Sequence, residues 1–410
     1  MRHLLLASLA TVLLTACATP TGTPPDTQAP APVRDGLPER TAPPAPVPAS
    51  PTSPPQSAPP PRPIPAPTPE LPRVTVPQLL PPGIADRAGW AADIQTAFAA
   101  LGLPPNATNL CAAMAVIEQE STWQAEPVVP GLPAIVRAEI EKRRSRYGIP
   151  KLLLDAALSR RSPDGHSYQT RIDTLRNEKQ MSQLFDDMIS ELPYGRTLLA
   201  DQNPVHTGGP MQVSFAFAEA HVRERTYPYP RRGNLRDEVF TRRGGVYFGI
   251  ANLLDYPASY PAPLYRFADF NAGRYSSRNA AFQFAVARLT RTKLTLDGDL
   301  LRYVDGKPSC TTSQTQAALE KLTGKLGLSR AQIIQDLIQE KAPGFESTTT
   351  WRRVFSLADQ ALGQAMPRQR LPGIDLKSPK IQRKLTTEWF ARRVDGRYRG
   401  CLARAEAGAV

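Results

Sequence analysis

Several residue types and patterns are scarce in this chain of 410 residues. It holds 4 histidines and 4 cysteines, with no Cys-x-x-Cys pair, which excludes a zinc finger or a multi-zinc protein. No apolar run approaches the roughly 20 residues that cross a bilayer as a helix, which excludes a polytopic membrane protein. Strand signals are also scarce, apart from a possible hairpin around Asp297-Gly298. Apolar residues instead recur at helical spacing, so the sequence predicts a mainly α fold.

Proline, in contrast, is abundant, and more than half of the 44 prolines lie between Pro20 and Pro82. This Pro/Ala/Thr/Ser segment cannot bury enough apolar surface to offset chain entropy, so residues 17–82 are predicted to be a disordered tether. Its basic and acidic residues balance, so it is not a basic arm for nucleic acid. The rest of the chain has globular composition and is long enough for one large domain or two.

The first residues have the pattern of an export signal. Met1-Arg2-His3 is basic, Leu4 to Leu14 is apolar, and Leu14-Thr15-Ala16-Cys17 resembles the lipobox of bacterial lipoproteins. The resemblance implies cleavage after residue 16, acylation of Cys17 with fatty acids such as palmitate, and attachment to the membrane. Ala18 then favours the periplasmic side of the outer membrane. The alternative is an ordinary signal peptide followed by an incidental cysteine.

The excess of basic residues bears on partners. There are 50 Lys and Arg against 37 Asp and Glu, a net charge of +13. Export excludes genomic DNA, and no nucleic-acid partner is predicted. Peptidoglycan carries carboxylates, so a basic exported domain would be attracted to it. A basic surface that serves only solubility would have the same composition.

The cysteines allow one disulfide once Cys17 is acylated, because three cysteines then remain. Cys111 lies in an apolar helical run and is expected to be a buried small hydrophobic residue. A bridge between Cys310 and Cys401 is therefore predicted.

The strongest chemical signal is a carboxylate at the end of an apolar helix. In the segment from Ala115 to Trp123, Glu118 and Glu120 point to different faces, because a helix turns about 100° per residue. They cannot form a carboxylate pair, but one of them can act as a lone acid. A carboxyl group at the mouth of an apolar pocket loses solvation, which raises its pKa and lets it donate a proton. The alternative is a solvated helix-end carboxylate.

Three short motifs, in order along the chain, resemble the soluble lytic transglycosylases. Glu120-Ser121 resembles their catalytic Glu-Ser motif, residues 209–213 (Gly-Pro-Met-Gln-Val) resemble their Gly-Leu-Met-Gln-Ile motif, and residues 270–273 (Phe-Asn-Ala-Gly) resemble their Tyr-Asn-Ala-Gly motif. Residues 244–249 resemble the helix that precedes the third motif. The resemblance implies a lysozyme-like domain at residues 83–305, followed by a helical C-terminal region at residues 306–410.

The chain departs from this family at several points. The link between the first two motifs is longer than usual, so residues of about 124–205 are interpreted as a helical insertion. Pro210 replaces the usual Leu or Ala, and Phe270 replaces the usual Tyr. The tyrosine of the family's fourth motif has no clear counterpart, and its candidates are Tyr247, Tyr265 and Tyr275.

The resemblance also implies a function. The enzyme would cleave the bond between N-acetylmuramic acid and N-acetylglucosamine in peptidoglycan glycan strands, with Glu120 as acid and then base and with no metal or cofactor. The positions expected to bind substrate are Ser121, Met211, Gln212, Tyr247, Phe270, Asn271 and Gly273. Asn271 is equally compatible with a simple helix C-cap. A hydrolytic muramidase and a non-catalytic peptidoglycan-binding scaffold are the alternative functions.

Overall fold

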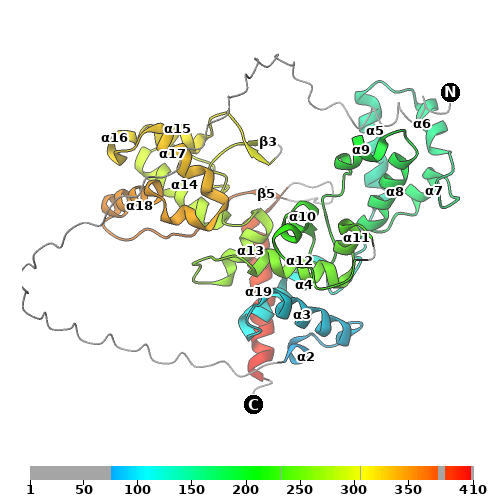
Figure 1. Cartoon of the computed structure of the whole chain (residues 1–410), viewed down its shortest axis with the longest axis horizontal. Helices are drawn as coiled ribbons and strands as arrows, with labels where there is room; N and C mark the ends of the chain where they lie inside the picture. Colours follow the sequence, from blue (N-terminus) through cyan, green and yellow to red (C-terminus); the bar gives the residue numbers. More distant parts are fainter. Residues whose placement is uncertain (1–74, 232, 305, 377–383, 408–410) are drawn as a thin grey trace, which may run out of the picture. The chain divides into compact units, whose positions relative to one another are not determined.

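The computed structural model describes residues 75–231, 233–304, 306–376 and 384–407 (Figure 1). The predicted export signal, Cys17 and most of the predicted tether lie outside these residues. The described part is mainly helical, as the sequence predicts, and its strands form short antiparallel two-stranded hairpins. None of its helices has the length and apolarity needed to cross a bilayer.

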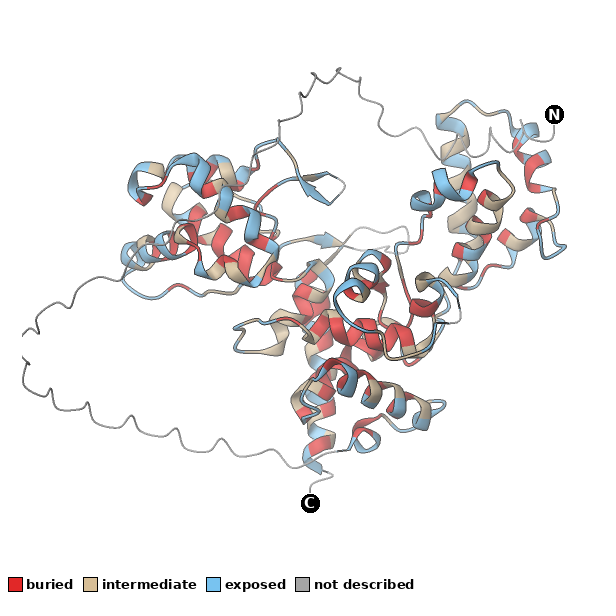
Figure 2. Ribbon diagram, viewed as in Figure 1, coloured by how far each residue is buried: buried red, intermediate tan, exposed pale blue. Residues whose placement is uncertain are grey.

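The described residues bury their apolar side chains in separate cores, and the first core uses both ends of the described chain. Its strands β1 (Thr207–Gly208) and β2 (Val213–Ser214) pair as a hairpin. Its helices are α2 (Val76–Leu79), α3 (Arg87–Leu101), α4 (Ala107–Ser121), α10 (Phe215–Glu224), α11 (Leu235–Phe240), α12 (Arg242–Leu254), α13 (Pro263–Ala272) and α19 (Thr387–Ala407). Figure 2 shows α12 as an almost continuously buried element, with Gly244 to Ala251 all buried.

The chain between α4 and β1 forms its own small apolar clusters. Its elements are α5 (Leu132–Arg146), α6 (Lys151–Leu158), α7 (Tyr168–Asp173), α8 (Glu178–Ser190), α9 (Gly195–Leu199) and the 3-10 helix η1 (Ala200–Gln202). This is the region that the long link between the first two motifs led us to interpret as an insertion. Leu154, Ile172 and Leu184 are among its buried residues.

A further core lies between α13 and α19 in the sequence. Its elements are α14 (Ser276–Thr290), β3 (Tyr303–Val304), β4 (Lys307–Pro308), α15 (Gln314–Glu320), α16 (Thr323–Leu326), α17 (Arg330–Leu337), η2 (Ile338–Lys341), η3 (Pro343–Ser347) and α18 (Thr349–Leu362). The strands β5 (Asp375–Leu376) and β6 (Leu385–Thr386) then lead into α19.

The core boundaries differ from the predicted division at residue 305. Helix α14 was expected in the first domain, but Phe282 and Val286 on it are buried with α15 to α18. Helix α19 was expected in a separate C-terminal region, but Phe390 and Val394 on it belong to the first core. Helical periodicity marks which residues are buried and cannot tell which core buries them.

The predicted tether also ends earlier than residue 82. Residues 76–79 form α2, and Val76, Leu79 and Leu80 are buried in the first core. Pro77 fits in the first turn of this helix, where a backbone N–H has no intrahelical partner. Proline content alone therefore overestimates the length of the tether.

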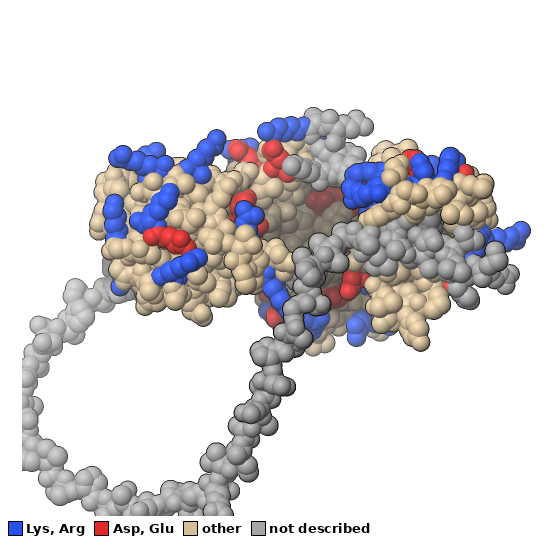
Figure 3. Space-filling view, turned by 90° about the horizontal axis from the view of Figure 1, so that it is seen from above, with Lys and Arg blue, Asp and Glu red and all other residues tan. Residues whose placement is uncertain are grey.

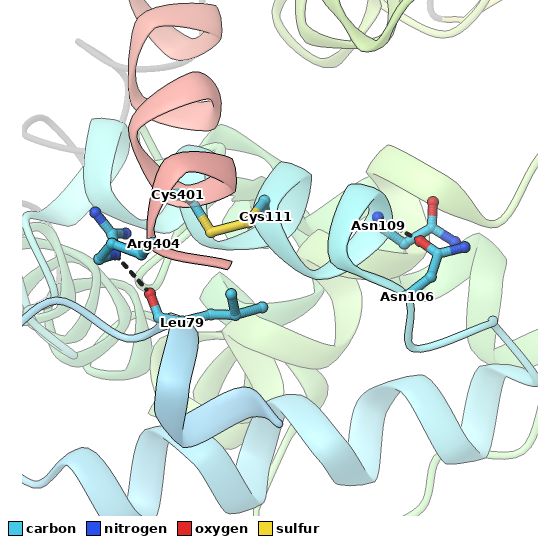
Figure 4. The surroundings of a disulfide bond; sticks show 6 residues. All are labelled: Leu79, Asn106, Asn109, Cys111, Cys401 and Arg404. Atoms are coloured by element: carbon cyan, nitrogen blue, oxygen red, sulfur yellow. Dashed lines mark hydrogen bonds between the residues drawn. A yellow bond between two sulfur atoms is a disulfide. The ribbon is translucent and has the colours of Figure 1, made fainter. Parts of the chain in front are cut away.

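The disulfide prediction is wrong, because Cys111 on α4 bonds to Cys401 on α19 (Figure 4). Their Cα atoms lie 5.5 Å apart, and both residues are buried where α4 and α19 pack together. Cys310 is free and exposed. The bridge joins residues 290 positions apart, a pairing that the spacing of cysteines could not indicate.

The expected hairpin around Asp297-Gly298 is wrong as well, and β3 pairs with β4 instead. Side chains of α14 bind the backbone of this turn. The Gly298 N–H donates to Gln283 Oε1 at 2.9 Å, and Asn279 Nδ2 donates to the Gly298 carbonyl at 3.0 Å. A turn whose backbone groups are occupied in this way cannot form cross-strand bonds.

Candidate active site

Helix α12 packs against the elements that carry the three motifs. It contacts α4, which ends in Glu120-Ser121, and β2, which follows Gln212. It also contacts α13, whose last residues are Phe270, Asn271 and Ala272. The elements that carry the three motifs therefore share α12 as a packing partner in the first core (Figure 1).

Residues of the second motif pack directly against glycines of α12. A Cβ atom on Gly249 would lie 2.5 Å from Met211 Cβ, and one on Gly245 would collide with the Pro210 ring. Real side chains do not approach so closely, so only glycine permits this contact between helix and hairpin. Met211 is fully buried in the contact, which supports the hairpin from beneath and leaves the side chain no surface for a substrate.

Gln212 lies at the tip of the hairpin in a left-handed conformation, with φ of +50°. Its side chain is partly exposed, and its own hairpin holds it in place. Thr207 Oγ1 donates to Gln212 Oε1 at 3.2 Å, and Gln212 Nε2 donates to the Gly209 carbonyl at 3.3 Å. The amide is thus positioned before any ligand arrives, with part of its surface accessible.

Glu120 lies half-buried in the last turn of α4. The next residue, Ser121, is buried, and its hydroxyl donates to the Ile117 carbonyl at 2.9 Å. Ser121 therefore supports the end of the helix and has no surface for substrate. Glu118 faces another side of α4, with Oε1 3.7 Å from Arg397 Nε, so the two glutamates do not form a carboxylate pair.

The backbone after Glu120 turns abruptly. Thr122 and Trp123 are both left-handed, with φ of +50° and +61°. Such conformations cost roughly 1–2 kcal/mol for each non-glycine residue, so the surrounding packing must hold them. Trp123 is buried and meets the ring of Trp90 edge-on at a centroid distance of 5.2 Å. This contact fixes the chain three residues beyond the candidate acid.

The third motif ends α13. Phe270 is half-buried against the first core, and Asn271 is exposed. Gly273 has φ of +106°, a conformation that glycine adopts without steric cost, and its N–H donates to the Asp269 carbonyl at 2.7 Å. Asn271 Oδ1 accepts a hydrogen bond from Thr387 Oγ1 at 3.1 Å. Asn271 is therefore joined to the first residue of α19.

Tyr247 is a core residue and has no surface for a substrate, which corrects its predicted role. It is 1% exposed, lies 3.1 Å from His221 Nε2 through its hydroxyl, and donates to the Thr226 carbonyl at 3.3 Å. Burial raises the pKa of Tyr247 and lowers the pKa of His221. Tyr275, another candidate for the fourth motif, is also buried.

Asp269 is a residue that sequence reasoning missed. It is buried, and its carboxylate accepts hydrogen bonds from the hydroxyl of Tyr260 at 2.6 Å and from the backbone N–H groups of Tyr275 and Ser277 at 2.9 and 2.7 Å. Burial raises the pKa of Asp269. The carboxylate connects the end of α13 to the start of α14. An acidic residue in the last turn of a helix is unfavourable in isolation, and that signal could have identified it.

The expected substrate positions therefore form two groups. Three are buried and support the site from within the first core: Ser121, Met211 and Tyr247. Four are at least partly exposed: Gln212, Phe270, Asn271 and Gly273. On the face seen in Figure 3, Lys and Arg side chains are dispersed and interspersed with Asp and Glu. The overall positive charge therefore does not single out one region of that face.

Comparison with known proteins identifies the family. The family described as "Protein of unknown function (DUF1615)" matches residues 83–404. This chain belongs to that family. It is also 50% identical over 327 residues to the uncharacterized protein YaiW of Escherichia coli (strain K12), a match that covers 80% of this chain and 88% of that protein. No solved structure matches the chain.

The family match has a structural consequence. Its range begins before α3 and ends after Cys401, so it includes Cys111, Cys401 and all three motifs. Helices α5 to α9 and the core of α14 to α18 also lie inside it. They are parts of the family region and not additions to its ends.

Proposed function

We propose that this protein is a peptidoglycan lytic transglycosylase with a lysozyme-like first core and Glu120 as its only catalytic carboxyl group. The observation that carries the proposal is that the elements carrying the three motifs all pack against α12, where Pro210 and Met211 contact the glycines of that helix. A chance match of three short motifs would not require their elements to share one packing partner.

In the proposed reaction Glu120 first donates a proton to the glycosidic oxygen between N-acetylmuramic acid and N-acetylglucosamine, and the bond from C1 to that oxygen breaks. The resulting carboxylate then accepts the proton of the muramoyl C6 hydroxyl, whose oxygen bonds to C1. The products are a 1,6-anhydro end and a free sugar hydroxyl, and no water is consumed. A second carboxylate, which hydrolytic glycosidases commonly use, is not needed.

The position of Glu120 suits this role. It lies half-buried in the last turn of α4, so part of its side chain remains accessible. Gln212 offers an oriented amide for an acetamido group of the sugar. Asn271 offers an exposed amide on the adjoining helix α13.

We also propose that the protein is a lipoprotein anchored through Cys17 on the periplasmic side of the outer membrane. The apolar segment before Cys17 and the lipobox-like residues around it support this localisation. The test is a Cys17→Ser variant, with membrane fractionation and mass spectrometry of the mature N-terminus. The variant should leave the membrane fraction and lose the mass of the acyl chains. Unchanged membrane association without any lipid mass would overturn the proposal.

The test of the enzymatic proposal uses purified peptidoglycan sacculi. The protein is incubated with them, and the released muropeptides are analysed by mass spectrometry. Anhydro-muropeptides are expected from the native protein and not from Glu120→Gln, which keeps the shape of the side chain but cannot donate the proton. Glu141→Gln is the matched control, because Glu141 pairs with Arg144 on the surface of α5.

Each other outcome identifies a different function. Reducing ends with water added would indicate a hydrolytic muramidase. Sedimentation with sacculi without any released product, equal for the native protein and Glu120→Gln, would indicate a peptidoglycan-binding protein. Equal melting temperatures of the two variants and the native protein are needed to exclude loss of fold as the cause.

A further inference from the structure

A basic groove runs along α19, beside α4. It has a volume of about 520 Å³. The residues lining it are Glu118, Arg392, Arg393, Gly396, Arg397, Gly400 and Arg404. Four guanidinium groups against one carboxylate give this groove a local charge of about +3, from the formal charges of these side chains.

The spacing of these residues on α19 explains how the groove forms. Arg393, Arg397, Gly400 and Arg404 recur at intervals of four, three and four, so they lie on one stripe of the helix. The apolar residues that pack into the first core, such as Val394, lie on an adjoining stripe. One helix therefore presents a buried apolar face and a basic face, and the basic face extends over roughly 18 Å at about 1.5 Å per residue.

The two glycines are the unusual feature of the groove. Gly396 and Gly400 lie one turn apart inside a helix of 21 residues, and both are exposed. A Cβ atom added to either would meet nothing within 4 Å. Glycine weakens a helix interior relative to alanine, and here no packing contact accounts for it. The result is an uncovered strip of backbone that a ligand can approach closely, with arginines along it.

The arginines are only partly engaged with protein groups. Arg404 Nε donates to the Leu79 carbonyl at 3.0 Å (Figure 4), and Arg392 Nε bonds to Glu388 at 2.8 Å. Arg397 Nε is buried and has no hydrogen-bond partner in the described part of the chain. Glu118 Oε1 forms an ion pair with it at 3.7 Å, beyond hydrogen-bond distance. Burial lowers the pKa of Arg397 although Glu118 opposes the shift.

We propose that this groove binds a ligand bearing two or more phosphate groups. Guanidinium groups form paired, charge-assisted hydrogen bonds with phosphate, and one phosphate accepts from several donors at once. Four arginines along an open strip of backbone match several such groups better than a single carboxylate, which one arginine can saturate. The ligand is either the phosphorylated headgroup of a lipid or a free phosphorylated molecule.

The proposal is independent of the enzymatic one. Glu118, the residue of α4 that lines the groove, is separated from Glu120 by about 200° around the helix, so the groove and the candidate acid lie on different sides of α4. A loss of phosphate binding would leave the transglycosylase proposal intact, and the reverse also holds.

The first test is calorimetric titration of the purified protein, in a Cys17→Ser background, with tripolyphosphate. Saturable binding that weakens as salt is added is expected. Arg397→Ala should weaken binding roughly tenfold, the usual size of one lost charge-assisted hydrogen bond. Arg399→Ala is the matched control, because Arg399 is on the same helix, is exposed and paired with Asp395, and lies outside the groove. It should leave the affinity within about twofold of the native value.

Substituting a glycine of the groove should raise the stability of the protein and weaken its phosphate binding. Gly400→Ala should raise the melting temperature by about 2 °C, because alanine stabilises a helix interior, and should weaken tripolyphosphate binding at least threefold. Gly324→Ala on α16 is the control, since a Cβ there also meets nothing within 4 Å, and it should not change binding. If Gly400→Ala binds tripolyphosphate as well as the native protein does, the exposed backbone at the glycines has no role in binding.

Two further measurements test whether the ligand is a phosphate and whether it belongs to a lipid. Citrate carries several carboxylates, and equal affinity for citrate and tripolyphosphate would overturn the assignment to phosphate. Sedimentation with vesicles of phosphatidylcholine, with and without cardiolipin, whose headgroup bears two phosphates, separates the two sources. Binding only to the cardiolipin vesicles, lost in Arg397→Ala, supports a lipid headgroup, and tripolyphosphate binding without vesicle binding supports a free ligand. Absence of both kinds of binding, or equal binding by Arg397→Ala and Arg399→Ala, overturns the proposal.

Discussion

Helices α12 and α19 belong to the same core, and each carries a pair of glycines one turn apart, but the two pairs have opposite surroundings. On α12, Pro210 and Met211 fill the space at Gly245 and Gly249. On α19, the space at Gly396 and Gly400 is open. The first pair is explained by packing and the second is not. A glycine without a packing role is therefore a better indicator of a binding surface than glycine content itself.

The two helices are also held in different ways. Helix α12 is fixed by its fit to the hairpin, whereas α19 is tied to α4 by the bond between Cys111 and Cys401. Replacing both cysteines with serine should cost the largest amount of stability, about 4–5 kcal/mol, because the bridge closes a very long loop of the unfolded chain. Chemical denaturation with and without reductant would measure it. A native protein that loses no stability on reduction would contradict this expectation.

The second-largest loss of stability is expected at the contact between α12 and the β1–β2 hairpin. Gly249→Ala places a methyl group against Met211 Cβ, and we expect a loss of about 3 kcal/mol, because a close-packed contact must open. Gly396→Ala is the matched control on α19 and should not destabilise the protein. Equal effects at the two positions, measured by thermal unfolding, would remove the distinction between them.

Helix α14, in the second described core, is held by buried polar groups instead, since Arg278 and Asn279 on it both donate to the Glu340 carbonyl. Glu340 accepts from the backbone N–H of Leu300, and burial raises the pKa of Glu340 to about 7. The folded protein therefore keeps a proton that the unfolded chain loses near its ordinary pKa. Stability should fall as the pH rises from about 4.5 to about 7, by about 2–3 kcal/mol in the native protein.

Glu340→Gln separates this effect from other titrations. Glutamine keeps an acceptor for the Leu300 N–H and does not ionise, so the stability of the variant should fall less over the same pH range. The measurement is the difference between the two unfolding free energies at several pH values. An identical pH dependence in both proteins would show that Glu340 is not responsible.

The smallest change in stability is expected at the two glycines of α19 that no side chain contacts. Gly396→Ala and Gly400→Ala should each stabilise the protein by about 0.5–1 kcal/mol, since the helix gains from alanine and no contact is lost. Urea denaturation resolves changes of this size when both variants and the native protein are measured together. Destabilisation by either variant would mean that the space beside these two glycines is filled in the folded protein and is not open.

The mainly α fold was predictable because helical periodicity depends on local burial. Apolar residues between Trp90 and Leu101 recur at helical spacing, for example, and they are buried on α3. The positive φ of Gly273 also has a local cause, since glycine commonly follows the last residue of a helix in this way. The disulfide and the core to which α19 belongs were not predictable, because they depend on contacts between residues some 290 positions apart.

The candidate site was predictable in part. The motifs indicated Glu120, Gln212 and Asn271, which lie at element ends with part of their surface accessible. The sequence could not distinguish these from Ser121 and Tyr247, which are buried, because a motif gives the residue and not its exposure. The groove on α19 was missed because scattered arginines have no recognisable spacing until the helix face is known.

The packing of α19 against α2 and α4 constrains the order in which the protein can mature. Synthesis runs from the N-terminus, so α4 exists long before Cys401 and its helix are made. The first core stays open until the final stretch of chain has emerged, whereas the core of α14 to α18 is complete in sequence earlier. Cys111 therefore remains a thiol until Cys401 is present. During that interval Cys310 can form a disulfide with it instead. The native bond then depends on α19 folding against α4 before this competing bond forms.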